Sequence, residues 1–204
     1  NHVTLLLPIT EIYFQQNVIT QVASIILMDG VILLSVIAFF LELSTKKNLY
    51  LFSFIKNLIL NPFILSIIIG LLFLLFNLNI NQTPIEYTLS KLAACVSPVG
   101  LFAIGITLSF YTKNVINKFS VSISILKLII SPIILLLIGF LFFNAGSPAE
   151  IPGAFFVSVA PCGVTAIVLC SAYNVSPENI IKAIFVSTIA SIGTIFFAIK
   201  YLTL

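Results

Sequence analysis

The chain has 204 residues, of which 60% are hydrophobic and 7% are charged, and its formal net charge is +3. A soluble domain carries about 25% charged residues, so this chain has too few charges to cover a surface that faces water. The composition excludes a soluble protein and indicates a chain that lies in a lipid bilayer. The positive charge is no sign of nucleic-acid binding, because most of the lysines fall in loops between apolar stretches.

A helix that crosses a membrane needs about 20 mostly apolar residues. Six stretches meet this requirement, and they are Thr20–Leu43, Pro62–Leu78, Thr88–Tyr111, Ser120–Asn144, Ile151–Tyr173 and Ile180–Leu204. A shorter apolar stretch, Val3–Ile12, precedes them and contains Pro8. We interpret it as the second half of a span whose first half is missing. The sequence therefore predicts an all-α polytopic membrane protein.

Loops that contain lysine alternate with loops that contain none. The loop after the first span holds Lys46, Lys47 and Lys56, and the loop after the third holds Lys113 and Lys118. The loops after the second and fourth spans hold no lysine. Because lysine-rich loops stay in the cytoplasm, the lysine-bearing loops are expected inside and the C-terminus outside.

The two ends of the chain share a pattern. Val3–Ile12 and Ile151–Tyr173 each contain a proline, and each is followed by a short polar break and a proline-free span. On the expected topology the two units have opposite orientations, which is typical of inverted repeats in secondary transporters. The expected domains are residues 1–56, the remnant of a first repeat (half of its fourth span and its fifth span), and residues 57–204, a complete second repeat of five helices.

Pro161 interrupts the middle of the span Ile151–Tyr173. It has no N–H to donate, and its ring clashes with the carbonyl four residues earlier. Gly163 adds backbone freedom beside it. In lipid, a freed backbone group is costly unless protein, water or a ligand satisfies it, so a broken helix is expected where a cavity or substrate needs it. A simple proline kink is the alternative.

Asn1 and Pro8 mark a second candidate break near the start of the chain. If both breaks lie at the same depth, two helix N-termini face one cavity. Each carries about half a positive charge and offers N–H donors, which suits a carboxylate. Cys162 lies beside Pro161, and the Thr165 hydroxyl is close enough in sequence to contribute.

Asp29 and Lys127 are charged residues that lie well inside apolar spans, away from the span ends, where a charge is costly and is a functional candidate. Asp29 could relay a proton or hold a cation, or it could be a neutral acid that bonds a neighbouring helix. Lys127 lies about two turns from the cytoplasmic end of its span, so it could snorkel, form an ion pair or face the substrate pathway.

The remaining polar residues predict no metal site and no enzyme. Cys95, Cys162 and Cys170 have no CxxC or Cys/His spacing, so neither a metal site nor a disulfide is expected. Ser187, Thr188 and Ser191 are interpreted as interhelical hydrogen-bond partners rather than ligands. The spans contain no paired aspartates, His/Glu set or Ser/His dyad, so we expect no catalysis.

Six motifs follow one another along the chain. They are Asn61-Pro62-Phe63-Ile64, the stretch Ser97–Leu108, the stretch Leu126–Pro132, Ala160-Pro161-Cys162-Gly163, Ala172-Tyr173-Asn174, and Ser187-Thr188. In order and spacing they resemble the auxin efflux carrier family, which includes bacterial malonate-permease-like proteins. The resemblance covers essentially the whole chain.

The resemblance implies a carrier of ten spans in two inverted five-helix repeats, similar in plan to sodium/proton antiporters. In that family the fourth helix of each repeat is broken at a proline, and the two breaks cross at the substrate site. The resemblance implies that Pro8 and Pro161 are these prolines and that Asn1 is the crossover asparagine. It also implies that the chain is truncated at its N-terminus.

The expected function is secondary active transport of small organic anions, such as malonate, other dicarboxylates or auxin-like acids, across a bacterial inner membrane. The expected partners are the anion and membrane lipid, without nucleic acid or a cofactor. Coupling to protons or sodium ions and assembly as a homodimer are left open. The alternatives are a non-transporting fragment or partner-dependent membrane subunit, and a relative of bile-acid-type sodium symporters.

Overall fold

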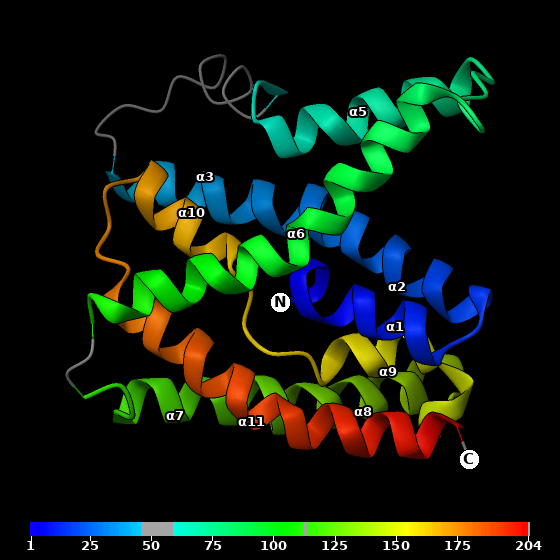
Figure 1. The fold of residues 1–204 in the computed structure, drawn as a ribbon. Coiled ribbons are helices and arrows are strands. Elements are labelled where there is room, and N and C mark those ends of the chain that lie inside the picture. The colour runs from blue at the N-terminus through cyan, green and yellow to red at the C-terminus, as the bar shows by residue number, and fades with distance from the viewer. Residues whose placement is uncertain (46–58, 112–113, 204) are drawn as a thin grey trace. The chain divides into compact units, whose positions relative to one another are not determined.

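The structure of the chain is a computed structural model that describes residues 1–45, 59–111 and 114–203. Within these ranges every regular element is a helix, as the sequence predicts (Figure 1). The expected boundary between residues 56 and 57 lies outside the described residues, and so do Lys46, Lys47, Lys56 and Lys113.

Within the described ranges, four helices are long and apolar enough to cross a membrane, and each has 26 residues. They are Gln16–Leu41, α6 (Pro84–Ser109), Lys118–Phe143 and α11 (Glu178–Thr203). The first contains α2 (Gln16–Met28), η2 (Asp29–Leu33) and most of α3 (Leu34–Thr45), and the third joins α7 (Lys118–Ile125), η3 (Leu126–Ile130) and α8 (Ser131–Phe143). Each is about 39 Å long, against a hydrocarbon core of about 30 Å, which confirms four of the six expected spans.

The other two expected spans differ from the expectation. Helix α5 (Pro62–Leu75) has 14 residues and ends before Leu78. It ends there because Asn77 adopts a left-handed φ of 49°, and the Leu78 N–H bonds the Phe73 carbonyl at 2.9 Å. The expected span Ile151–Tyr173 consists of α9 (Pro152–Ser158) and α10 (Thr165–Ala172), which are separated by a non-helical segment (Figure 1).

Two π-helices directly precede prolines. Helix η1 (His2–Leu6) leads into α1 (Leu7–Tyr13), whose second residue is Pro8, and η3 leads into α8, whose second residue is Pro132. A proline crowds the carbonyl four residues earlier, and a wider turn relieves that clash. The chain is therefore helical from His2 to Tyr13, and the break expected at Pro8 is absent.

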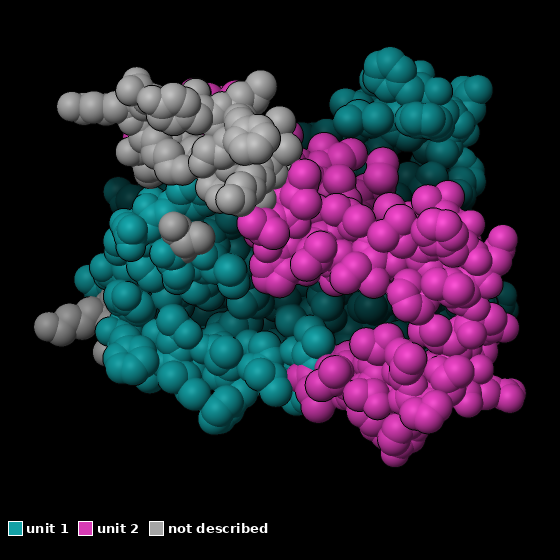
Figure 2. Space-filling model, turned by 90° about the horizontal axis from the view of Figure 1, so that it is seen from above, with its two compact units in different colours: residues 1–25, 96–204 teal, residues 26–95 magenta. Residues whose placement is uncertain are grey.

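Contacts divide the chain into two compact units, which Figure 2 colours separately. Unit 1 comprises residues 1–25 and 96–204, and unit 2 comprises residues 26–95. In unit 1, α11 packs along α7 and α9, and α8 also packs on α9. Phe156, Ile181 and Ile184 are fully buried, and the Phe14 ring centre lies 4.9 Å from that of Phe156. The core of unit 1 therefore surrounds α9, the helix that precedes the break.

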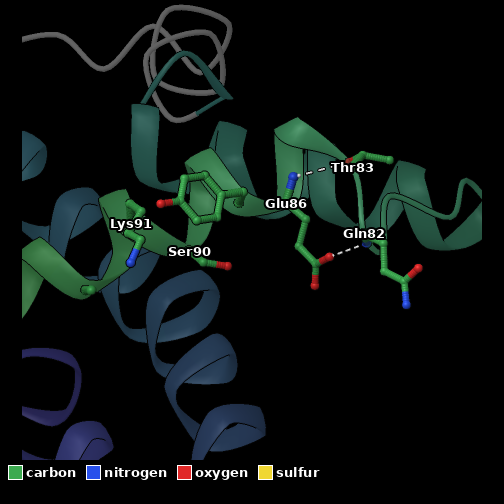
Figure 3. A pocket seen from close by; sticks show the side chains of 7 residues that line it. Gln82, Thr83, Glu86, Ser90 and Lys91 are labelled. Atoms are coloured by element: carbon green, nitrogen blue, oxygen red, sulfur yellow. Dashed lines mark hydrogen bonds between the residues drawn. The ribbon is translucent and has the colours of Figure 1, made fainter.

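In unit 2, α5 contacts η2, and the first half of α6 carries an open pocket of 470 Å³ (Figure 3). The lining residues are Gln82, Thr83, Glu86, Tyr87, Ser90, Lys91 and Ala94. The Glu86 carboxylate accepts from the Gln82 N–H, and the Lys91 ammonium lies 5.3 Å from the Tyr87 ring centre. The pocket contains one acid and one base, so its charge does not favour an anion over a cation.

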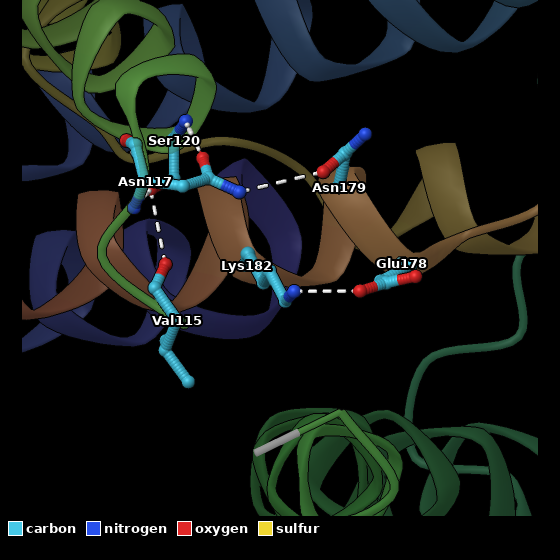
Figure 4. A network of polar contacts seen from close by, with 6 residues as sticks. All are labelled: Val115, Asn117, Ser120, Glu178, Asn179 and Lys182. Atoms are coloured by element: carbon cyan, nitrogen blue, oxygen red, sulfur yellow. Dashed lines mark hydrogen bonds and ion pairs between the residues drawn. The ribbon is translucent and has the colours of Figure 1, made fainter. Parts of the chain in front are cut away.

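A polar network joins the first turns of α7 and α11 (Figure 4). Asn117 caps α7, because its side-chain oxygen accepts from the Ser120 N–H at 2.7 Å and its own N–H donates to the Ser120 hydroxyl at 3.0 Å. The Asn117 amide also donates to Asn179 Oδ1 at 3.4 Å. Nearby, the buried Lys182 ammonium lies 2.6 Å from the Glu178 carboxylate.

We predict that Asn117→Ala lowers the free energy of unfolding in detergent by about 1–2 kcal/mol, because it removes the cap of α7. Thermal unfolding of the purified protein measures this change. Asn179→Ala is the matched control, since it removes only the long amide bond and should cost much less. An equal effect of the two substitutions would show that the cap contributes nothing.

Candidate functional site

The candidate site is the break between α9 and α10, in residues 159–164. Pro161 cannot continue the hydrogen-bond ladder of α9, and Gly163 follows two residues later. Ala160 and Pro161 are buried within unit 1. The break therefore exposes backbone groups inside the protein, and these groups need partners.

The ammonium of Lys127, a residue of η3, lies at the C-terminal end of α9. Its Nζ donates to the Val157 carbonyl at 3.5 Å and to the Ser158 carbonyl at 3.4 Å. The Val157 carbonyl is the one that would have accepted from residue 161, had that residue not been proline. An ammonium at mid-span costs about 3 kcal/mol on insertion, and bonds to helix-end carbonyls offset part of this cost. The long stem of Lys127 thus reaches toward the break.

Helix α11 satisfies two more groups of the break. The Thr194 hydroxyl donates to the Val159 carbonyl at 3.2 Å, and the Ser187 hydroxyl accepts from the Cys162 N–H at 3.1 Å. Ser187 and Thr194 are seven residues apart, so they lie on one face of the helix. Ser187 therefore bonds a residue outside its own helix, as interpreted, whereas the Thr188 and Ser191 hydroxyls donate to carbonyls of α11 itself.

The first residue of the chain meets the break. The backbone nitrogen of Asn1 donates to the Pro161 carbonyl, and Asn1 is only 4% exposed. A β-carbon at Gly163 would lie 3.7 Å from that nitrogen, an ordinary contact distance, and 3.3 Å from the Thr165 hydroxyl, so the two segments lie close together here. The structure therefore brings together Asn1, Pro161, Gly163 and Thr165.

Thr4 connects Asn1 to α6. Its hydroxyl donates to the Asn1 side-chain oxygen, and its carbonyl accepts from the Ser97 hydroxyl. In a regular α-helix the N–H of residue 8 would donate to the Thr4 carbonyl, four residues earlier. Pro8 has no N–H, and the Ser97 hydroxyl supplies the donor instead. A β-carbon at Gly100 would lie 2.7 Å from Thr4 Cγ2, which shows how closely α6 approaches here.

The other expected site residues lie in different surroundings. Cys162 is half-buried and takes part through its N–H. Thr165 is the first residue of α10 and is exposed. Pro8 lies inside the helical stretch, beyond η1. Asp29 belongs to unit 2, where it begins the π-helix η2 and is half-buried.

Sequence reasoning did not single out Thr4, Ser97 or Thr194 as residues of this site. Ser97 had one signal, because it directly precedes Pro98 within a motif of small residues. Thr194 had a weaker one, since Ser187, Ser191 and Thr194 follow a helical spacing in an otherwise apolar span. Neither signal shows which helix the hydroxyl faces.

The comparisons with known proteins agree with this architecture. A family model described as "Membrane transport protein" matches residues 7–199, which is nearly the whole chain. No curated protein and no solved structure matches it. Together with the four apolar helices, the family match identifies an integral membrane protein. The chain belongs to the membrane transport protein family, the family of auxin efflux carrier-type transporters.

Proposed function

We propose that this transporter carries small organic anions, such as malonate, other dicarboxylates or auxin-like acids, as a secondary active carrier. The observation that supports this best is the bond from the Asn1 backbone nitrogen to the Pro161 carbonyl. It joins two segments 160 residues apart at an interrupted helix, and interrupted helices form the substrate sites of many secondary transporters. The proposed site comprises Asn1, Pro161, Cys162, Gly163 and Thr165, with Pro8 in the adjoining helix.

The proposed setting is a bacterial inner membrane with the C-terminus outside, as the distribution of lysines between loops suggests. We propose no enzymatic activity, since the family is one of transporters. A homodimer is compatible with the proposal and is not required by it.

Uptake of labelled malonate into proteoliposomes tests the proposal, with the natural gene product that carries this chain. We predict saturable uptake without a requirement for sodium, and a loss of about tenfold or more in Pro161→Ala. The substitution allows α9 and α10 to join, and a small displacement of binding groups costs about 100-fold in rate. The amount of protein in the membrane should stay unchanged.

Pro84→Ala is the matched control, because Pro84 is an exposed first residue of α6 and should leave uptake intact. Unchanged uptake in Pro161→Ala would remove the break from the mechanism. A strict requirement for sodium would favour a relative of the bile-acid-type symporters instead.

Asp29 is the proposed coupling residue in unit 2. It lies near the middle of the span Gln16–Leu41 and begins a π-helix, an irregularity that is frequent at functional sites. We predict that Asp29→Asn abolishes uptake driven by a proton gradient and preserves exchange of malonate between the two sides. Ser35→Ala, which removes only a hydroxyl bonded to its own helix, is the control. Full gradient-driven uptake in Asp29→Asn would refute the coupling role.

A further inference from the structure

The peptide group between Pro161 and Cys162 is held at both of its ends. Its carbonyl accepts from the Asn1 nitrogen, which comes from the start of the chain. Its N–H, that of Cys162, donates to the Ser187 hydroxyl of α11 at 3.1 Å. A trans peptide group is planar, and its carbonyl and N–H point in nearly opposite directions. The group therefore lies between the first segment of the chain on one side and α11 on the other.

The Ser187 hydroxyl acts at the break as an acceptor. Ser187 is fully buried, and its hydroxyl donates to the Ile184 carbonyl of its own helix at 3.0 Å. Because a hydroxyl has one proton, that bond leaves only the lone pairs of the oxygen for the Cys162 N–H. Ser187 is the tenth residue of the 26-residue α11, so the bond lies well inside the span, where lipid offers no substitute acceptor.

The orientation of this peptide group sets the direction of the chain beyond it. A planar group that is bonded at both ends cannot rotate freely, which restricts ψ of Pro161 and φ of Cys162. Gly163 follows and lacks the β-carbon that would restrict its own backbone angles. The Ser187 bond is therefore a constraint that keeps Gly163, a residue of the proposed site, close to the Asn1 nitrogen.

We propose that Ser187 is a positioning residue of the transport site, whose oxygen holds the Pro161–Cys162 peptide group in the orientation that binds the substrate. The proposal rests on the transport of organic anions proposed above and names a residue that acts on the site through the backbone. Loss of the acceptor leaves the Cys162 N–H buried without a partner, and the peptide group rotates to find one. Only a fraction of the carriers then has the binding geometry, and the apparent affinity falls by that fraction.

Transport kinetics separate this positioning role from a structural one. A saturating concentration of substrate selects the carriers that have the binding geometry. Loss of positioning therefore raises KM and leaves the maximal rate per folded protein unchanged. A merely structural defect reduces the number of working carriers, which lowers the maximal rate and leaves KM unchanged.

The first measurement is the KM of malonate uptake by the natural gene product in proteoliposomes. We expect Ser187→Ala to raise KM by about tenfold, because it leaves one buried donor without an acceptor. Ser187→Thr, which keeps the hydroxyl, should have a lower KM than Ser187→Val, which has the same shape without it. Ser191→Ala is the matched control, since Ser191 is also fully buried in α11 and its hydroxyl donates to the Thr188 carbonyl of that helix at 2.7 Å.

Hydrogen exchange of the Cys162 amide tests the bond itself and requires no transport. Selective isotope labelling of the cysteine nitrogens makes this amide visible by NMR in detergent, and Cys162→Ser identifies its signal. We expect slow exchange in the unmodified protein and in Ser191→Ala, and exchange about tenfold faster in Ser187→Ala. The Cys170 amide, which lies inside α10, is the internal reference.

The possible results are distinguishable. An unchanged KM in Ser187→Ala, or rapid exchange of the Cys162 amide in the unmodified protein, overturns the role of Ser187 and leaves the proposed function standing. If the unmodified protein takes up no malonate, the proposed function is overturned, and the exchange of Cys162 alone decides whether Ser187 holds the peptide group. If Ser187→Ala fails to fold, Ser187→Cys decides, because sulfur is a weaker acceptor and an unchanged KM in that variant overturns the proposal.

Discussion

The structure depends on one constraint, which is that lipid offers no hydrogen bonds to a freed backbone group. Pro161 frees such groups in the middle of a span, and the neighbouring helices must satisfy them. Lys127 bonds two carbonyls at the end of α9, Thr194 bonds a third, and Ser187 accepts from the Cys162 N–H. The Asn1 nitrogen bonds the Pro161 carbonyl. The interruption thereby fixes where the surrounding helices of unit 1 lie.

Two prolines meet this constraint in different ways. Pro161 interrupts its helix, whereas Pro8 follows a π-turn in a helix that continues. The wider turn of η1 relieves the clash of the Pro8 ring, so that helix continues. Gly163 follows Pro161 and gives the backbone freedom to leave the helix.

Much of the fold could be predicted from the sequence, because the hydropathy of a stretch depends on its own residues and not on how the helices pack. Four long spans and the interruption at Pro161 follow from apolar length and from a missing N–H. The early end of α5 did not follow, since Asn77 turns left-handed only in the context of its neighbours. Ser97 and Thr194 could not be assigned as hydrogen-bond donors to the Thr4 and Val159 carbonyls either, because packing decides which face of a helix meets its neighbour. The interruption expected at Pro8 was wrong because a local string does not distinguish a widened turn from a break.

The π-helices before Pro8 and Pro132 also affect how relatives of this chain can be compared. A π-turn holds one residue more than the α-turn it replaces, so every side chain on its N-terminal side is rotated by about 100° relative to an unwidened helix. Lys127 lies inside such a turn. A relative without the extra residue would therefore align only with a gap of one position, and an ungapped alignment would pair Lys127 with a residue on another face.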